Sequence, residues 1–266
     1  MAPTLLGILN ITEDSFSDGG KFLDPAAASE QARTLARDAD VLDLGAASSK
    51  PGAFAVSPET EIARLAPVVE MLKRENIAVS VDTFSPAVQR WALSQDVDYL
   101  NDVRGFPEAD LHPELAASSA KLIVMFSVEE KGPATRLLVP AEELFDRITR
   151  FFETRIAALT GAGVARERLI LDPGMGLFLG SHPDASFTVL RRIAELKRAL
   201  ALPVLISVSR KSFLRRLVGR SVAGIGPATL AAELFAVRQG ADYIRTHDPG
   251  ALKDLLLVLE TLENKA

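Results

Sequence analysis

Residues 5–14 read Leu-Leu-Gly-Ile-Leu-Asn-Ile-Thr-Glu-Asp, an apolar run that passes directly into polar residues. Such a run is typical of a buried β-strand. A strand that opens a dinucleotide-binding sheet would be followed by the pattern Gly-x-Gly-x-x-Gly, which this stretch does not contain. The main alternative for a chain of this length, a doubly wound sheet, is therefore disfavoured at its most diagnostic position.

Seven further short apolar runs follow, and segments with helical spacing separate them. These runs are 41–44, 79–81, 99–100, 122–125, 169–171, 204–208 and 243–244. Asp24-Pro25 and Ser57-Pro58 each place a capping residue before a proline, which is typical of a helix start. Eight strand–helix units without a linker or a repeat predict an α/β fold, a single (β/α)8 TIM barrel domain over residues 1–266.

Apolar residues at helical spacing predict which helix faces are buried. A long helix carries Phe145, Ile148, Phe152, Ile156 and Leu159 on one face. The last helix carries Leu252, Leu255, Leu256, Leu259 and Leu262, which we expect to form its buried stripe.

Composition excludes several classes of function. The chain has 266 residues, 30 basic against 35 acidic side chains, and no cysteine. An acidic balance disfavours general nucleic-acid binding, and the lack of cysteine excludes disulfides, thiolate zinc sites and a cysteine nucleophile. Because no apolar run approaches ~18 residues and residues 1–10 lack a signal-peptide pattern, we expect a cytoplasmic protein without membrane or nucleic-acid partners.

Polar residues end seven of the eight predicted strands. They are Asn10, Asp43, Asp82, Asn101, Asp172, Ser207 with Ser209, and Arg245 with His247. Barrel enzymes build their active sites at these strand ends. Carboxylates that converge there are unfavourable unless a ligand or partner binds them, so helix capping alone does not explain the set.

The types of side chain in this set indicate the chemistry of a ligand. Asp82, Asn101 and Asp172 offer acceptors and one amide, which suit a flat heterocycle with several N–H donors. Lys211, Arg245 and His247 follow the last two strands, where barrels commonly bind phosphate. Asn10 offers an oxygen that could assist Mg²⁺ on a pyrophosphate. The other two histidines, His112 and His182, adjoin prolines, and we expect them in surface loops.

Seven longer motifs occur in order along the chain. They are 7–12 with 14–20, 48–52, 80–83, 101–103, 172–174, 209–213 and 245–248. Together they resemble the dihydropteroate synthase family. The resemblance implies a transferase of folate biosynthesis that condenses 6-hydroxymethyl-7,8-dihydropterin pyrophosphate with p-aminobenzoate, giving 7,8-dihydropteroate and pyrophosphate. It also implies Mg²⁺ as cofactor, small-molecule substrates and a homodimer.

The resemblance assigns roles to individual residues. It places the pterin against Asp82, Asn101, Val103, Met125, Asp172 and Lys211. It places Mg²⁺ and the leaving pyrophosphate near Asn10, Arg245 and His247. It places p-aminobenzoate near Phe16, Ser49, Pro51 and Ser209. The chemistry it implies is dissociative: pyrophosphate leaves, the arylamine attacks a pterin-methyl cation, and Asp82, Lys211, Arg245 and His247 act as the catalytic set.

Departures from the family pattern fall outside the pterin pocket. Lys50 replaces the usual arginine, which has a planar fork of donors that lysine lacks. Residues 176–180 read Gly-Leu-Phe-Leu-Gly in place of Gly-Phe-Gly-Lys, in a segment about two residues longer. This pattern resembles the acquired sulfonamide-resistant (Sul-type) branch, and it makes Lys50 and Phe178 candidates for discrimination against sulfonamides.

Two other functions share part of this pattern. A pterin-dependent methyltransferase would use the same carboxylates but has no reason to keep Ser15-Phe16 or 209–213. A non-catalytic pterin-binding protein would have no use for residues that handle pyrophosphate, which here are Asn10, Lys211, Arg245 and His247. Release of pyrophosphate that requires the arylamine distinguishes the synthase from both.

Overall fold

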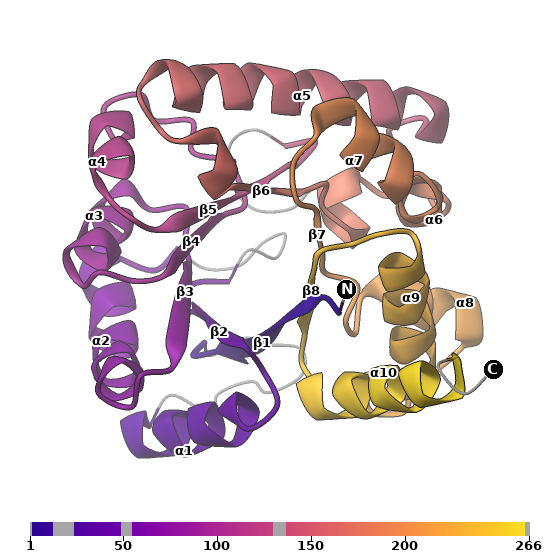
Figure 1. Ribbon diagram of the computed structural model, residues 1–266, viewed down its shortest axis with the longest axis horizontal. Helices are drawn as coiled ribbons and strands as arrows, with labels where there is room; N and C mark the ends of the chain where they lie inside the picture. The colour runs from indigo at the N-terminus through magenta and orange to yellow at the C-terminus, as the bar shows by residue number, and fades with distance from the viewer. Residues whose placement is uncertain (1, 13–23, 49–54, 130–136, 264–266) are drawn as a thin grey trace.

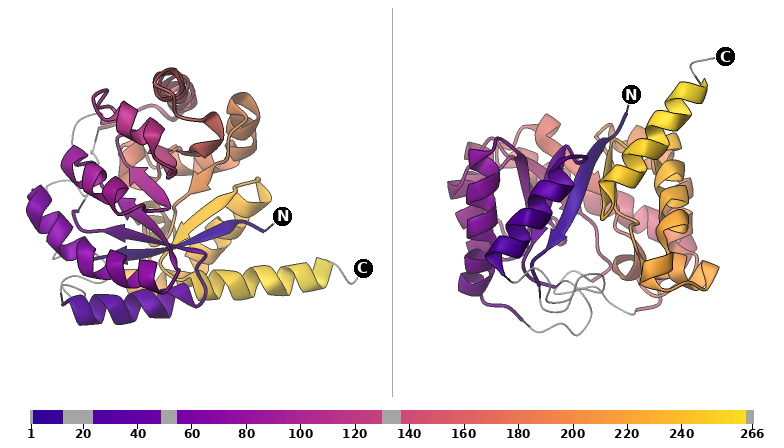
Figure 2. Two further views of the ribbon diagram at one scale, coloured as in Figure 1. Left: turned by 60° about the vertical axis from the view of Figure 1, so that its left-hand side comes forward. Right: turned by 90° about the horizontal axis from the view of Figure 1, so that it is seen from below.

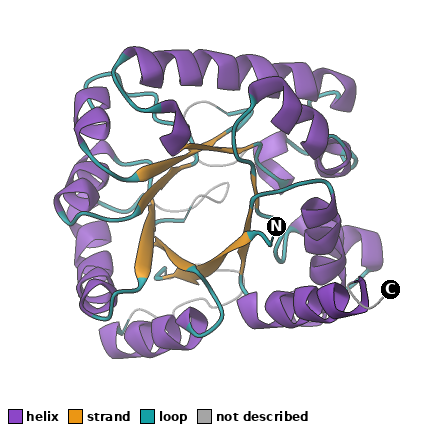
Figure 3. Ribbon diagram, viewed as in Figure 1, coloured by secondary structure: helices purple, strands orange, loops and turns teal. Residues whose placement is uncertain are grey.

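Eight parallel strands form a ring in the centre of the molecule, and helices cover its outside (Figure 1, Figure 3). The computed structural model describes residues 2–12, 24–48, 55–129 and 137–263. The strands are β1 (Thr4–Asn10), β2 (Val41–Gly45), β3 (Ala78–Asp82), β4 (Tyr99–Asp102), β5 (Lys121–Met125), β6 (Leu169–Asp172), β7 (Leu205–Ile206) and β8 (Tyr243–Thr246).

The sheet is a nearly closed barrel. Its strand order is β6-β5-β4-β3-β2-β1-β8-β7, and all the paired strands are parallel. The two end strands meet at a single parallel bridge between Leu171 and Val204. The predicted strand 204–208 shrinks to two paired residues, because Val204 forms only this bridge and Ser207 to Ser209 already turn toward α8. The predicted TIM barrel is confirmed.

Ten α-helices and three 3₁₀-helices lie in the described residues. They are α1 (Pro25–Ala36), α2 (Pro58–Arg74), α3 (Pro86–Ser94), α4 (His112–Ala117), α5 (Ala141–Gly161), η1 (Arg166–Arg168), η2 (Gly176–Leu179), α6 (Ala185–Arg191), α7 (Ile193–Leu200), α8 (Ser212–Val218), η3 (Val222–Gly224), α9 (Gly226–Arg238) and α10 (Pro249–Glu263). Asp24 and Ser57 cap α1 and α2 by accepting the backbone N–H of Ala27 and of Thr60, as predicted.

Apolar side chains fill the space around and inside the barrel. The predicted face of α5 is buried, from Phe145 to Leu159. A second cluster lies inside the ring, where Tyr99 and Tyr243 stack edge to face beside Leu6, Ile123 and other residues of the strands. This cluster fills the N-terminal half of the barrel, and the polar strand ends lie at its opposite end.

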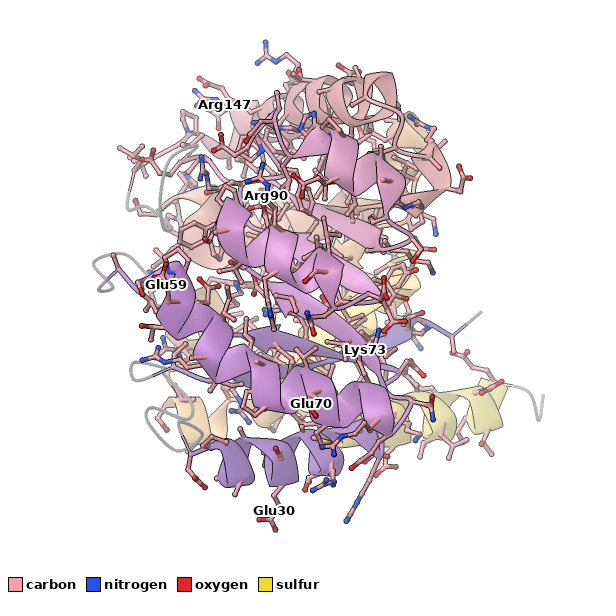
Figure 4. The ribbon with its side chains drawn as sticks, turned by 90° about the vertical axis from the view of Figure 1, so that its left-hand side faces the viewer. Glu30, Glu59, Glu70, Lys73, Arg90 and Arg147 are labelled. Carbon is pink, nitrogen blue, oxygen red and sulfur yellow. The ribbon has the colours of Figure 1, made fainter. Side chains whose placement is uncertain are left out.

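Charged side chains cover the outer face of helices α2 and α3. On one side, Glu59, Glu70 and Lys73 of α2 and Arg90 of α3 point away from the barrel (Figure 4). No helix in the described ranges is long and apolar enough to span a bilayer.

The predicted buried stripe of the last helix is wrong for most of α10. Of the expected buried stripe only Leu252 is fully buried, and Leu262 is 67% exposed. The reason is geometric: α10 runs past the edge of the barrel toward the C-terminus, so its last turns have no strand beneath them (Figure 2).

The prediction that His112 lies in a surface loop is also wrong. It is buried at the start of α4, not exposed in a loop, and its Nε2 lies 2.9 Å from the carbonyl oxygen of Phe106. His182 lies in a turn, as expected, where its Nδ1 accepts the backbone N–H of Asp184.

Candidate active site

A cavity of about 260 Å³ opens at the C-terminal ends of the strands. The predicted residues that line it are Asn10, Asp82, Asn101, Val103, Met125, Asp172, Phe178, Ser209, Lys211, Arg245 and His247. The barrel therefore brings together residues from seven strand ends and from the η2 segment. Four other predicted residues, Phe16, Ser49, Lys50 and Pro51, lie outside the described residues.

Arg245 holds two carboxylates together on the β8 side of this cavity. Its Nε lies 2.5 Å from Oδ2 of Asp43, and its Nη2 lies 2.7 Å from Oδ2 of Asp82. Burial alone would lower the pKa of Arg245, but the charges of Asp43 and Asp82 raise it above its ordinary value. Arg245 is thus a fixed cation whose position is set from two strands.

Asp82 presents its carboxylate to the cavity from the end of β3. The pKa of Asp82 is raised to about 7: burial raises it most, the charge of Arg245 opposes this shift, and the nearby Asp43 and Asp102 add to it. Arg245 is therefore the group that favours the ionised form of Asp82. A carboxylate in this state interacts strongly with any positive charge that develops above it.

Asn101 and Asp172 provide buried acceptors. Asn101 is buried, and its Oδ1 makes no hydrogen bond within the described part of the chain. Oδ1 of Asp172 accepts the backbone N–H of Gly174 at 2.8 Å, and burial raises the pKa of Asp172 to about 6. Gly174 has φ +73°, and a Cβ there would lie 2.5 Å from the Phe126 carbonyl oxygen, so the Asp-Pro-Gly turn requires glycine.

Lys211 joins the acceptor side of the cavity to its rim. Burial lowers the pKa of Lys211 to about 8, and the charge of Asp172 opposes this shift. Its Nζ also lies 4.9 Å from the centre of the Phe178 ring, a cation–π contact. The ammonium group therefore interacts both with the charge of Asp172 in the pocket and with the Phe178 ring of the η2 segment.

Ser209 and His247 pair across the ends of β7 and β8. The backbone N–H of His247 donates to Ser209 Oγ at 3.1 Å, and the same oxygen lies 3.0 Å from Nδ1 of His247. Burial, followed by the charges of Arg210, Arg245 and Lys211, lowers the pKa of His247 well below its ordinary value. His247 is consequently a neutral imidazole at pH 7.

The structure adds residues that the sequence did not assign to the site. Asp43 follows the same strand-end pattern as Asp82, but only the fold reveals it as the partner of Arg245. Arg210 and Arg215 also line the cavity, one before and one within α8. In the sequence, only the high density of basic residues in 210–216 points to them. A search restricted to polar residues at strand ends does not select them.

A barrel with clustered acceptors and cations at this end defines a class of pterin-binding enzymes. The family described as "Pterin binding enzyme" matches residues 6–247 of this chain. "Dihydropteroate synthase type-2" of Escherichia coli is 58% identical over 263 residues, covering 98% of this chain and 97% of that protein. The chain belongs to the dihydropteroate synthase family, and it is a transferase of folate biosynthesis.

Solved structures agree with this assignment. The Yersinia pestis dihydropteroate synthase in complex with a sulfonamide drug has a TM-score of 0.88 at 30% identity, covering 99% of this chain and 95% of that one. The Xanthomonas albilineans dihydropteroate synthase with 4-aminobenzoic acid has a TM-score of 0.87 at 32% identity, covering 98% and 93%.

Proposed function

We propose that this cavity condenses 6-hydroxymethyl-7,8-dihydropterin pyrophosphate with p-aminobenzoate by a dissociative route. The observation that carries the proposal is the division of the cavity: buried acceptors at its floor, and Lys211, Arg245 and His247 on the side of β7 and β8. A pterin with an attached pyrophosphate matches both parts. No described side chain is needed as a nucleophile, because such a reaction requires only preorganised charges.

The pterin ring lies at the floor of the barrel in this proposal. Asp172 and Asn101 accept N–H groups at its edge, and Val103 and Met125 pack against its faces. The ring thereby supplies the hydrogen bond that Asn101 Oδ1 otherwise lacks. Asp82, held by Arg245, offsets the positive charge that forms on the pterin methylene as pyrophosphate departs.

The pyrophosphate occupies the cationic side. Arg245 and Lys211 stabilise its developing negative charge, and neutral His247 contributes a hydrogen bond without carrying a proton away. After departure, the amine of p-aminobenzoate attacks from the rim, where Ser209 and Phe178 lie. The attacking nitrogen then loses its proton to solvent or to the released pyrophosphate.

Asn10 is suited to assist Mg²⁺ at the pyrophosphate. A Cβ on Gly45 would lie 3.4 Å from Asn10 Oδ1, so glycine leaves room at this amide oxygen. Within the described ranges no three His, Asp or Glu residues form a metal-binding group. This donor set fits Mg²⁺, which binds through few protein oxygens plus substrate phosphates and waters. Bound there, Mg²⁺ supplies charge neutralisation on the pyrophosphate.

The proposed activity is tested by release of pyrophosphate. The purified protein is incubated with pterin pyrophosphate, Mg²⁺ and p-aminobenzoate, and each component is omitted in turn. We expect release only when the arylamine is present. Arylamine-independent hydrolysis, or binding without release, would contradict the synthase assignment and favour a non-catalytic pterin-binding protein. Transfer of a methyl group would favour the methyltransferase.

Lys211→Ala is expected to weaken binding of pterin pyrophosphate more than binding of the dihydropterin alone. The reason is that Lys211 supplies charge to the pyrophosphate, whereas the ring is held mainly by Asp172 and Asn101. Calorimetric titration with both ligands measures the difference. Equal weakening would show that Lys211 acts on the ring through Asp172, and Lys211→Arg serves as the charge-preserving control.

We also propose a homodimer that buries an apolar face formed by α8, α9 and α10. The three helices are neighbours (Figure 1). Exposed large apolar side chains gather on them: Leu217, Val218, Phe235, Leu257, Val258 and Leu262. Exposed apolar side chains on neighbouring helices are typical of an interface, and a second copy of the chain is the partner that the family resemblance suggests.

Replacing Leu257 and Leu262 with Glu is expected to convert the dimer to a monomer, because two charges would be desolvated in the interface. Light scattering after gel filtration measures the mass. Leu138→Glu is the matched control, since Leu138 is 71% exposed but lies before α5, outside the apolar face. A wild-type monomer, or dissociation caused equally by the control, would contradict this interface.

A further inference from the structure

A buried glutamine lies close to the ends of β3 and β4, and the mechanism above does not use it. Gln89 belongs to α3 and is 1% exposed, and its side chain does not line the cavity. A buried amide is unfavourable unless its hydrogen bonds are made inside the protein. The groups that bind the Gln89 amide therefore indicate what this side chain does.

The amide nitrogen of Gln89 joins two strand ends. Its Nε2 donates to the carbonyl oxygen of Thr83 at 3.0 Å and to Oδ2 of Asp102 at 3.0 Å, so both of its hydrogens are used. A reversed amide would place its oxygen against these two acceptors, so the partners fix its orientation. Thr83 directly follows Asp82, and Asp102 directly follows Asn101. Gln89 thus binds the residue next to each of two polar groups that line the cavity.

Asp102 shapes the loop that follows β4. Its Oδ1 accepts the backbone N–H of Arg104 at 2.8 Å, and its Oδ2 accepts that of Phe106 at 3.0 Å. The loop contains two consecutive residues with positive φ, Gly105 at +68° and Phe106 at +57°. This conformation is unfavourable for a bulky residue such as Phe106, so the surrounding hydrogen bonds must hold it there. The same loop carries Val103, which lines the cavity.

A backbone hydrogen bond completes the connection between the two strand ends. The N–H of Thr83 donates to the carbonyl oxygen of Asn101 at 2.9 Å, one residue beyond the last paired residues, Asp82 and Asn101. The segment that leaves β3 therefore holds two successive residues of β4, Asn101 through the Thr83 N–H and Asp102 through the Gln89 amide. Without Gln89, only the backbone hydrogen bond of this pair would remain.

We propose that Gln89 is a positioning residue that clamps the end of β3 to the loop after β4, and so fixes Asp82, Asn101 and Val103 relative to one another. Displacements of about 1 Å are enough to weaken an oriented site. The use of this arrangement for a pterin ring rests on the proposed function. The clamp itself does not, because the opening of the loop can be measured in the protein without substrate.

Amide hydrogen exchange, followed by NMR in the substrate-free protein, tests the clamp. Gln89→Met keeps the approximate size of the side chain but removes both of its hydrogen bonds. We expect the backbone amides of Arg104 and Phe106 to exchange faster in this variant, because the Asp102 carboxylate that binds them is no longer held from α3. The amides of β8, which lie outside the clamp, should keep their wild-type exchange rates.

Ligand affinities of the folded variant provide the second readout. In Gln89→Met we expect the dissociation constant for the dihydropterin to rise on the order of tenfold, which corresponds to about one oriented hydrogen bond. The KM for p-aminobenzoate should stay near the wild-type value, because the arylamine approaches from the rim. Gln95→Met is the matched control: Gln95 follows the same helix, is exposed, and binds the neighbouring Ser94, so neither readout should change.

If Gln89→Met does not fold, Gln89→Glu keeps the length of the side chain and retains at most one of the two hydrogen bonds, so the same amides should exchange faster than in the wild type. Unchanged exchange at Arg104 and Phe106 overturns the clamp. Faster exchange with an unchanged affinity for the dihydropterin shows that Gln89 serves stability alone and overturns its positioning role. A wild type that binds no dihydropterin contradicts the proposed function, and the exchange rates then decide on the clamp by themselves.

Discussion

Asp82→Asn is expected to lower kcat roughly 100-fold or more, since a preorganised charge contributes about 3 kcal/mol at a transition state. Binding of the dihydropterin should change far less, because Asn keeps the size of the side chain and Asn101 and Asp172 remain. The loss arises when positive charge forms on the pterin methylene and no anion lies beneath it. Single-turnover kinetics alongside calorimetric binding separates the two effects.

The structure supplies a matched control for this variant. Glu61 on α2 is also buried and close enough to raise the pKa of Asp82, but it does not line the cavity. Glu61→Gln therefore removes a neighbouring buried carboxyl group without touching substrate, and kcat should stay near the wild-type value. Near-normal turnover in Asp82→Asn, or an equal loss in Glu61→Gln, would refute the electrostatic role of Asp82.

The pH dependence gives Asp82 a second signature. Its pKa is raised to about 7, so the anion is lost as pH falls through 7 and gained as pH rises. We expect kcat/KM of the wild type to increase between pH 6 and pH 8 for this reason. In Asp82→Asn this increase of kcat/KM should disappear. The decrease of kcat/KM below about pH 6, which comes from protonation of Asp172, should remain.

Phe178→Ala is expected to tighten sulfonamide inhibition, lowering the inhibition constant several hundred-fold with little change in the KM for p-aminobenzoate. A sulfonamide copies the arylamine but replaces the carboxylate with a bulkier sulfonyl group. A side chain that occupies the extra space clashes with the drug alone. A clash of about 3–4 kcal/mol corresponds to several hundred-fold.

The structure favours this substitution over shortening the segment. Phe178 lines the cavity, and its ring lies against Lys211. The adjoining Leu179 is fully buried, and the Phe178 carbonyl oxygen accepts the backbone N–H of Val128, so a deletion would disturb the core as well. Leu177→Ala is the matched control, because Leu177 lines the same cavity from the same segment.

The two variants show whether Phe178 is the residue that discriminates between p-aminobenzoate and sulfonamides. Tighter sulfonamide inhibition in Phe178→Ala but not in Leu177→Ala supports a specific clash. An inhibition constant that is unchanged in both variants shows that Phe178 only packs against Lys211, and Lys50 becomes the next candidate.

The strands, their polar ends and the family motifs follow from the order of amino acids alone. Period and composition are local properties, so the runs at 5–9 and 41–44 identify strands without knowledge of their neighbours. Because parallel strands in a barrel all end on the same side, the sequence pattern is enough to place Asp82, Asn101 and Asp172 together. That inference needs the topology of the fold but no distances.

Which groups face one another depends on how distant segments pack. Arg245 and Asp43 are separated by 202 positions along the chain, yet their contact fixes the position of the cation in the cavity. The burial of Glu233 depends on how α9 packs against the rest of the barrel, and the exposure of Leu262 depends on where α10 leaves the barrel. Helical spacing does not specify such contacts. The same helical pattern can face a core or a second molecule, and only the packed structure distinguishes the two.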